Sequence, residues 1–360
     1  MIYNFHDFDI YLKMYFWKKN SNKNNFQQMA NSKKTIGVNG FGRIGRYFTK
    51  LSLQQPDLNV AVVNDLASIE TLAHLFKYDS VHGGLKENFT ISGNSLVFDS
   101  GKKIVFTQEK DPANIPWSDY GVEYVLESTG LFLTKEKAKA HLKGNVKKVI
   151  LSAPAQDETK TIVLGVNDSI IDSSDLIISN ASCTTNSAAP LVQVLMQLAE
   201  IESAYITTIH SYTTDQRLHD SPHKDLRRAR AAALSIVPTS TGAAKALTKI
   251  FPELEGKMGG CGMRVPVPDG SLTDLTMIVR NPPSVEQINA AFLEASKTNL
   301  KGILSYTEDP IVSVDIVGNT HSVIFDSLLT SVIGNMVKVV GWYDNEAGYS
   351  NRLIDLIQKI

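Results

Sequence analysis

Two residues in the middle of the chain could act together as a nucleophile and a base. Cys183 lies in the polar run 179–186 (SNASCTTN), at the start of a predicted helix. A helix N-terminus stabilises negative charge, so this position should lower the pKa of the thiol from its usual value of about 8.5. His210 ends an apolar run that predicts a strand, which would place the imidazole at the rim of a site.

Each of the two residues also has an ordinary structural explanation. A free cysteine is most often a small buried hydrophobe, and a histidine at a strand end is more often structural than catalytic. The hydroxyl and amide side chains around Cys183 argue against a dry core position. Sequence spacing cannot bring Cys183 and His210 together in space, so their pairing is a hypothesis.

A glycine-rich segment predicts a dinucleotide site. Gly40, Gly42 and Gly45 fit the pattern GxGxxG directly after a predicted strand, where a helix begins. Glycines let the backbone approach a pyrophosphate, and the helix N-terminus favours its charge. Asp65 follows the next predicted strand, where its carboxylate can bind ribose hydroxyls and would repel a 2′-phosphate. The pattern therefore favours NAD over NADP, and a tight turn without a ligand is the weaker alternative.

The elements that must position these residues alternate as in an α/β protein. We expect strands at 35–39, 60–64, 124–127, 149–152 and 176–179 with a helix at 43–54, then a helix at 183–200 and strands at 204–210, 272–280 and 336–343. The fold class expected is a Rossmann-type doubly wound parallel sheet plus an α+β catalytic domain with a mostly antiparallel sheet. We expect an NAD-binding domain at 33–181 and a catalytic domain at 182–345. The C-terminal helix, 346–360, has apolar residues at helical spacing and should pack back on the first domain.

The composition is that of a globular protein. Of the 360 residues, 20% are charged and 43% apolar, and the formal net charge is -1, which disfavours a disordered or membrane protein. No long Lys/Arg block indicates nucleic-acid binding, and no run of about 20 apolar residues predicts a membrane span. Cys183 and Cys261 stand outside any CxxC or Cys/His cluster, so we expect no disulfide framework, no metal site and a cytoplasmic setting.

The first residues differ from the rest of the chain. Residues 1–28 are rich in aromatic residues and Asn, and they have neither the charge order of a secretory signal nor the arginines of a mitochondrial presequence. We expect 1–32 to be a disordered or mis-called extension, with Met29 as the start.

Six segments resemble signatures of the glyceraldehyde-3-phosphate dehydrogenase family, in family order, and the likeness covers Lys33 to Ile360. They are 36–46 (IGVNGFGRIGR), 179–186 (SNASCTTN), 210–213 (HSYT), 239–245 (TSTGAAK), 263–266 (MRVP) and 342–346 (WYDNE). The likeness is closest to the NAD-dependent bacterial and glycolytic type, because the loop 219–228 keeps Pro222.

The resemblance implies a phosphorylating reaction of glycolysis or gluconeogenesis. D-glyceraldehyde 3-phosphate would be oxidised with NAD and inorganic phosphate to 1,3-bisphosphoglycerate, through a thioester on Cys183 and with His210 as the base. Matching positions assign Thr213 and Arg264 to the substrate phosphate. The residues matched to the attacking phosphate are Ser182, Thr184, Arg228, Thr241 and Gly242. Those matched to the cofactor are Gly40, Gly42, Arg43, Ile44, Asp65, Lys110, Ser128, Thr129, Ser152 and Asn345.

The resemblance also implies a homotetramer, in which the loop 211–230 lines a neighbouring subunit's cofactor site. Two positions depart from the family pattern: Ser187 stands where most relatives have a second cysteine, and Lys110 where many have an arginine. One alternative is an erythrose-4-phosphate dehydrogenase, which shares the fold and the nucleophile. Another is a nucleotide-binding redox sensor or RNA-binding protein, against which the set of Cys183, His210 and Arg264 argues.

Overall fold

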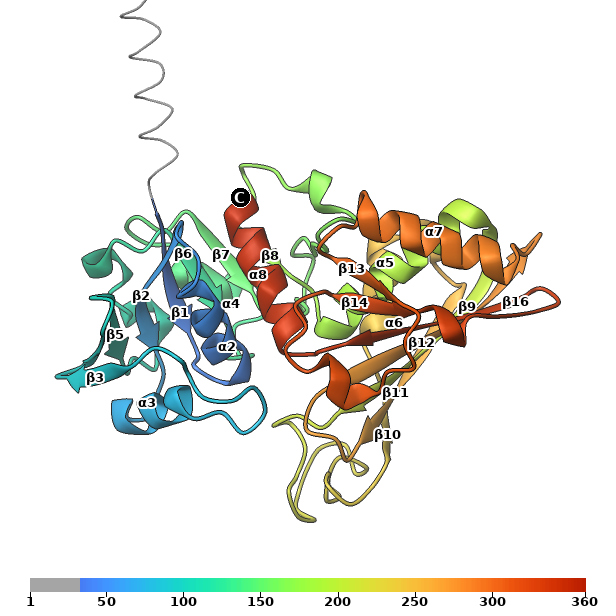
Figure 1. The fold of residues 1–360 in the computed structure, drawn as a ribbon. Coiled ribbons are helices and arrows are strands. Elements are labelled where there is room, and N and C mark those ends of the chain that lie inside the picture. Colours follow the sequence, from blue (N-terminus) through green and yellow to red (C-terminus); the bar gives the residue numbers. More distant parts are fainter. Residues whose placement is uncertain (1–32) are drawn as a thin grey trace, which may run out of the picture.

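The computed structural model describes residues 33–360, and they form two eight-stranded sheets that lie side by side in Figure 1. The expected extension lies outside the described residues. Within residues 33–360, no helix combines the length and the apolar character needed to cross a membrane.

The first sheet has the strand order β3-β4-β5-β2-β1-β6-β7-β8. Its elements are β1 (Lys34–Asn39), α2 (Arg43–Ser52), β2 (Leu58–Asn64), α3 (Ile69–Lys77), β3 (Phe89–Ser92), β4 (Ser95–Phe98), β5 (Lys103–Thr107), β6 (Tyr124–Glu127), α4 (Lys135–Ala138), β7 (Lys148–Leu151) and β8 (Ile177–Ser179). Strands β5, β2, β1, β6, β7 and β8 pair in parallel, and β3 and β4 add an antiparallel edge.

The chain leaves β1 toward β2 on one side and later places β6 on the other side. This reversal creates the crevice at the carboxyl ends of β1 and β6 in which doubly wound sheets bind nucleotides. The buried residues of β1 and β2, such as Ile36, Val38 and Val63, explain why these strands read as continuous apolar runs.

The second sheet has the order β10-β11-β9-β12-β16-β14-β13, with β15 paired to β16. Its elements are α5 (Cys183–Leu198), β9 (Glu200–Ser211), β10 (Val237–Thr239), α6 (Ala243–Ile250), β11 (Met258–Val265), β12 (Ser271–Arg280), α7 (Val285–Lys297), β13 (Leu304–Thr307), β14 (Val323–Asp326), β15 (Ser331–Ile333) and β16 (Met336–Tyr343). The pairs β9–β11 and β13–β14 are parallel and the others antiparallel. The expected α/β class, with one parallel-rich and one mostly antiparallel sheet, is confirmed.

The last helix, α8 (Ala347–Lys359), returns to the first sheet and runs beside α2 (Figure 1). Leu353 and Ile357 of α8 belong to the same buried cluster as Ile36 and Val38 of β1. Lys34 donates from Nζ to the carbonyls of Ile357, Gln358 and Ile360 at 2.8–2.9 Å. The two ends of the described chain are therefore joined.

Candidate active site

Cys183 is the first residue of α5, and the turn before it is tightly held. Ala181 has a φ of 56°, in the left-handed region that non-glycine residues rarely adopt. Ser182 caps the helix, and its Oγ accepts a hydrogen bond from the Thr185 N–H at 3.1 Å. The strained turn and the cap together aim the half-buried thiol of Cys183 out of the helix start.

The structure brings His210 to this thiol. His210 lies near the end of β9, and its Nε2 is 3.4 Å from Cys183 Sγ. Its Nδ1 lies 2.7 Å from the Ser211 carbonyl, so we assign the tautomer in which Nδ1–H donates to that oxygen and Nε2 faces the thiol with its lone pair. Arg264 lies opposite His210 in the register of β11 and β9, and its Nη1 donates to the Ser211 carbonyl at 2.9 Å. Nη1 also lies 2.8 Å from His210 Nδ1, which in this tautomer is a contact between two donors and not a hydrogen bond.

Burial favours the uncharged forms of both groups. It raises the pKa of Cys183, although Arg264 and the hydrogen bonds of Thr184 act in the opposite direction. It lowers the pKa of His210, and the guanidinium of Arg264 adds to that lowering. The lower thiol pKa expected from the helix N-terminus is therefore wrong for this structure, because loss of hydration outweighs Arg264 and the hydrogen bonds of Thr184. The pair is a thiol beside a neutral imidazole that can accept its proton.

A cavity of about 190 Å³ opens at this pair. It is lined by Pro154, Ser182, Cys183, Thr184, Thr208, His210, Arg228, Thr239, Ser240, Thr241, Gly242, Gly262 and Arg264. Cys183 begins α5, and Gly242 is the cap residue of α6, so two helix N-termini border one cavity. Helix N-termini and guanidinium groups are the donors that hold phosphate in proteins.

Residues predicted for the dinucleotide meet at the carboxyl ends of β1, β2 and β6. Gly40 has a φ of 93°, and a Cβ on Gly45 would meet the Gly40 carbonyl at 2.1 Å, so both positions require glycine. Asp65 accepts the Phe41 N–H at 2.7 Å and the Ala67 N–H at 3.0 Å, which ties the end of β2 to the glycine-rich turn. Ser128 donates to the Gly40 carbonyl at 2.6 Å from the end of β6. This glycine cradle at a helix start fits a dinucleotide.

Comparisons with known proteins agree with this arrangement. Residues 34–135 match the model for the glyceraldehyde 3-phosphate dehydrogenase NAD binding domain, and residues 182–345 match the model for the C-terminal domain of the same enzyme. Glyceraldehyde-3-phosphate dehydrogenase of Mycobacterium avium is 56% identical over 328 residues, which cover 89% of this chain and 97% of that protein. Glyceraldehyde-3-phosphate dehydrogenase 1 of Bacillus cereus and the enzyme of Geobacillus stearothermophilus are each 53% identical over 323 residues, covering 89% of this chain and 96% of theirs.

This chain belongs to the glyceraldehyde-3-phosphate dehydrogenase family. The members of this family are NAD-dependent oxidoreductases. Residues 34–135 match the NAD-binding domain of the family, so NAD is the cofactor. The sequence-based expectations of the family, the enzyme class and NAD are thereby confirmed.

The other residues predicted for the phosphates fall into two groups. Ser182, Thr184, Arg228, Thr241, Gly242 and Arg264 all line the cavity at Cys183. Thr213 does not: it lies on the loop after β9, where its N–H donates to Gln216 Oε1 at 3.3 Å. Arg228 is held by an ion pair with Asp215 and donates from Nε to Thr239 Oγ1 at 2.9 Å.

The predicted cofactor residues lie along the crevice in different ways. Gly42 and Ile44 frame the start of α2, Thr129 follows β6, Ser152 follows β7, and Lys110 is exposed on the segment after β5. The side chain of Arg43 is engaged in ion pairs with Glu346 and Asp79, so at the start of α2 only its backbone N–H remains for a ligand.

Asn345 follows β16 and binds two other strands of the second sheet, β9 and β12, beside His210. Its Oδ1 accepts from Ser211 Oγ at 2.8 Å and from Ser271 Oγ at 2.7 Å. These two bonds orient the amide and leave its nitrogen as the donor for a ligand.

Sequence reasoning missed Tyr343, Thr208, Thr239 and Ser240. Tyr343 hydroxyl lies 3.0 Å from Thr184 Oγ1 and 2.9 Å from Thr208 Oγ1, and its ring meets that of His210 edge-on at 6.0 Å. Tyr343 therefore buttresses both the helix start and the imidazole. Its place inside the WYDNE signature was the available signal.

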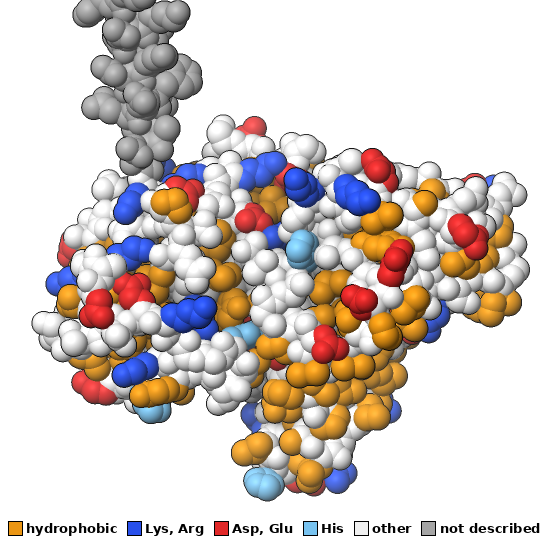
Figure 2. All heavy atoms as spheres, viewed as in Figure 1, with side chains coloured by type: hydrophobic (Ala, Val, Ile, Leu, Met, Phe, Trp, Pro, Cys, Tyr) orange, Lys and Arg blue, Asp and Glu red, His pale blue; other side chains and the backbone are white. Residues whose placement is uncertain are grey.

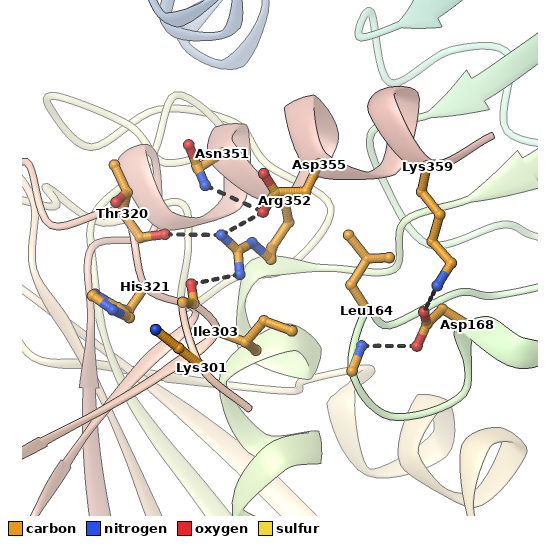
Figure 3. Close-up of a pocket in the computed structure, with 12 residues that line it drawn as sticks. Leu164, Asp168, Lys301, Ile303, Thr320, His321, Asn351, Arg352, Asp355 and Lys359 are labelled. Carbon is orange, nitrogen blue, oxygen red and sulfur yellow. Dashed lines mark hydrogen bonds and ion pairs between the residues drawn. The ribbon is translucent and has the colours of Figure 1, made fainter. Parts of the chain in front are cut away.

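A larger cavity of about 660 Å³ lies at α8 and contains none of the predicted residues (Figure 3). Four of its charged groups form pairs within the cavity wall: Arg352 binds Asp355 and also the Gly302 carbonyl, and Lys359 binds Asp168. Lys301 lines the cavity as well. Because these pairs are internal, we assign no ligand to this cavity.

Proposed function

We propose that this chain is a phosphorylating glyceraldehyde-3-phosphate dehydrogenase. The observation that carries the proposal is the 3.4 Å contact between Cys183 Sγ and His210 Nε2 inside a cavity with Arg264 and Arg228. A pure binding protein has no need of a nucleophile with its base, and the two guanidinium groups suit an anionic substrate.

The residues present perform the first half of the reaction as follows. Cys183 Sγ attacks the aldehyde carbon, and His210 Nε2 takes the thiol proton. His210 then returns a proton to the developing alkoxide and removes it again as the C–H hydride departs, leaving a thioester. When bound, NAD supplies the acceptor for that hydride.

The second half uses the anion donors at the two helix starts. An oxygen of inorganic phosphate attacks the thioester carbon, and the C–S bond breaks. Cys183 Sγ is the leaving group and stays on the enzyme as a thiolate, and the acyl phosphate is released. We assign the attacking phosphate to Ser182, Thr184, Thr241, Gly242 and Arg228. We assign the substrate phosphate to Arg264 with Thr213.

For the cofactor, we assign the pyrophosphate to the turn of Gly40 and Gly42 with the N–H groups of Arg43 and Ile44. We assign the adenosine ribose to Asp65 and the carboxamide of the nicotinamide to Asn345. We assign Lys110 to the adenine. We assign Ser128, Thr129 and Ser152 to contacts along the rest of the nucleotide.

We also infer the organisation of the whole protein: an NAD-binding domain at 33–181 completed by 346–360, a catalytic domain at 182–345, and a homotetramer that works in the cytoplasm. Figure 2 shows hydrophobic side chains gathered on the lobe that carries β10. The apolar side chains of Leu218, Leu226, Leu234 and Ile236 are exposed there, on or beside the loop after β9. An exposed apolar surface of this kind suits burial against another subunit.

The test is a rapid-mixing assay of NADH formation. With glyceraldehyde 3-phosphate and no phosphate, the parent should give a burst of about one NADH per site, and phosphate or arsenate should restore turnover. Thr241→Ala should keep the burst but slow the phosphate-dependent phase by roughly 10-fold or more, and Cys183→Ser should abolish the burst. Thr248→Ala, on the same α6 but outside the cavity, and Cys261→Ser are the controls. Full turnover without phosphate, with erythrose 4-phosphate as the better substrate, would contradict the assignment.

A further inference from the structure

A second polar cluster lies where the first sheet meets the second. It joins His82 from the loop after α3, Asp269 from the turn between β11 and β12, and Asp344 from the turn between β16 and α8. One donor atom from each residue lies within 4.8 Å of the donor atoms of the other two. The side chains are closed off from solvent: those of Asp269 and Asp344 are 0% exposed, and that of His82 is 2% exposed.

The carboxylate of Asp269 is buried without a hydrogen-bond partner among the described residues. Among residues 33–360, neither of its carboxylate oxygens has a hydrogen bond of ordinary geometry, and its nearest basic group is His82 Nε2 at 3.4 Å. A buried carboxylate without a partner is costly. Asp344 and Glu346 lie close enough to add their negative charges to that of Asp269, so a cation is the partner that this buried cluster lacks.

His82 is arranged as a metal ligand would be. Its Nε2 lies 3.0 Å from Glu346 Oε2 and 3.4 Å from Asp269 Oδ2. Donation of Nε2–H to Glu346 leaves a lone pair on Nδ1, so the Asp269 carboxylate must turn toward Nδ1 to share an ion with it. Within the described part of the chain, Nδ1 is buried without a hydrogen-bond partner, and it lies 3.8 Å from Asp344 Oδ2. A carboxylate that orients the histidine from behind is the usual companion of histidine ligands in metal sites.

The neighbouring cation does not neutralise these groups. Arg43 is engaged with Glu346 and Asp79. Asp344 is held in place by the N–H groups of Gly318, Glu346 and Ala347, which orient its carboxylate without removing its charge.

We propose that His82, Asp269 and Asp344 bind a divalent transition-metal cation, for which Zn²⁺ is the best match. One imidazole and two carboxylates suit Zn²⁺ in a tetrahedral site with one further ligand. Bonds of about 2.0–2.2 Å need donor atoms about 3.5 Å apart, so movements on the order of 1 Å would close the site. The ion would tie three segments together directly beside Asn345. The expectation of no metal site considered thiolates and could not foresee donors from three distant segments.

The test uses the full chain with Cys183→Ser, so that the reactive thiol cannot bind the metal. After treatment with chelator and return of ZnCl₂, elemental analysis of the gel-filtered protein should find one Zn²⁺ per subunit. Zn²⁺ should also raise the melting temperature, because a ligand of the folded state stabilises it. Co²⁺ in the same protein should give the visible absorption bands of a tetrahedral site with nitrogen and oxygen donors.

Asp269→Asn, which keeps the shape and loses the charge, should weaken Zn²⁺ binding by roughly 100-fold or more, since even loss of a residue that only orients a ligand costs about 10- to 100-fold. His82→Gln should do the same. Asp326→Asn, an equally buried aspartate outside the cluster, is the matched control and should retain the ion. The proposal is wrong if the Cys183→Ser protein binds no Zn²⁺, or if Asp269→Asn and His82→Gln bind it as tightly as their parent.

Discussion

At the scale of single residues, Asp65 combines two tasks. Its carboxylate holds the Phe41 and Ala67 N–H groups, and we assign it to the ribose of NAD. Asp65→Gly should lower kcat/KM for NAD by about 10-fold or more, because a charge-assisted partner and a support of the turn are lost together. The ratio of kcat/KM for NAD to kcat/KM for NADP should decrease in steady-state assays.

Asp65→Asn separates the two tasks of this residue. It retains an acceptor for a backbone N–H but not the charge that repels a 2′-phosphate. Asp65→Asn should therefore lower the preference for NAD over NADP, with a smaller loss of kcat/KM for NAD than Asp65→Gly causes. A parent protein that already reduces NADP as well as NAD would show that the role given to Asp65 is wrong.

Ser187 concerns oxidation of the nucleophile. It lies one turn after Cys183 in α5, is fully buried, and has its Oγ 2.9 Å from Thr273 Oγ1. Without a thiol there, peroxide should convert Cys183 to sulfenic and higher acids, or to a mixed disulfide with an added small thiol. Peptide mass spectrometry should find no bridge from Cys183 to Cys261, and finding one would contradict the prediction.

Ser187→Cys supplies the missing partner. Residues one helical turn apart have Cα atoms roughly 6 Å apart, within the range for a disulfide. Their Cβ atoms are about 5–6 Å apart, so the first turn of α5 must open slightly for the bridge to form. Peroxide should then yield a bridge between positions 183 and 187 that dithiothreitol reverses. Ser187→Ala, which changes the size and polarity without adding a thiol, is the control.

The residues around Cys183 illustrate how far sequence can reach. Ser182, Thr184, Arg228, Thr241, Gly242 and Arg264 could be named from short motifs, and they line one cavity with Cys183 and His210. Thr208 has no such motif, and although Tyr343 stands inside the WYDNE segment, the contact between the two depends on the register of β9, β12 and β16. The sign of the thiol pKa shift also depends on burial, which no motif records.

At the scale of elements, the core strands of both sheets were predictable, and most of the short strands nearer the sheet edges were not. The predictions found β1, β2, β6, β7, β9, β12 and β16 within a few residues. They also found β8, and they omitted eight strands: β3, β4, β5, β10, β11, β13, β14 and β15. A short edge strand carries too few alternating apolar residues to stand out from a loop.

The lock between β1 and α8 can be tested at one lysine. Lys34 donates to three carbonyls at the end of α8, where a cation also complements the helix dipole. Lys34→Met should destabilise the protein by about 1–3 kcal/mol and lower the melting temperature by several degrees. Lys33→Met, at the exposed neighbouring residue, should have little effect. Equal melting temperatures for the two variants would contradict the role of Lys34.

At the scale of the whole molecule, the two sheets followed from the change of pattern after residue 181, and the return of α8 followed from its apolar face. The meeting of His82, Asp269 and Asp344 had no such signal, because each comes from a different turn and only the packing of the sheets brings them together.

The extension is the simplest test at this scale. A chain that begins at Met29 should have unchanged activity and melting temperature, because residues 1–28 carry no periodic apolar face that could pack on the rest. Activity assays and thermal unfolding of the two chain lengths measure this. A shortened chain that misfolds would contradict the prediction.

The position of α8 also bears on how the protein is made. The ribosome produces β1 among the first ordered residues and α8 last, yet both belong to one buried cluster. At a synthesis rate of about 5–20 residues per second, β1 waits roughly 15–60 s for its partner. Throughout that time the nascent chain exposes the apolar groove that Leu353 and Ile357 will fill. A message cut short before Leu353 would yield a chain that lacks the residues covering this part of the first domain, and exposed apolar surface of that kind is prone to aggregation.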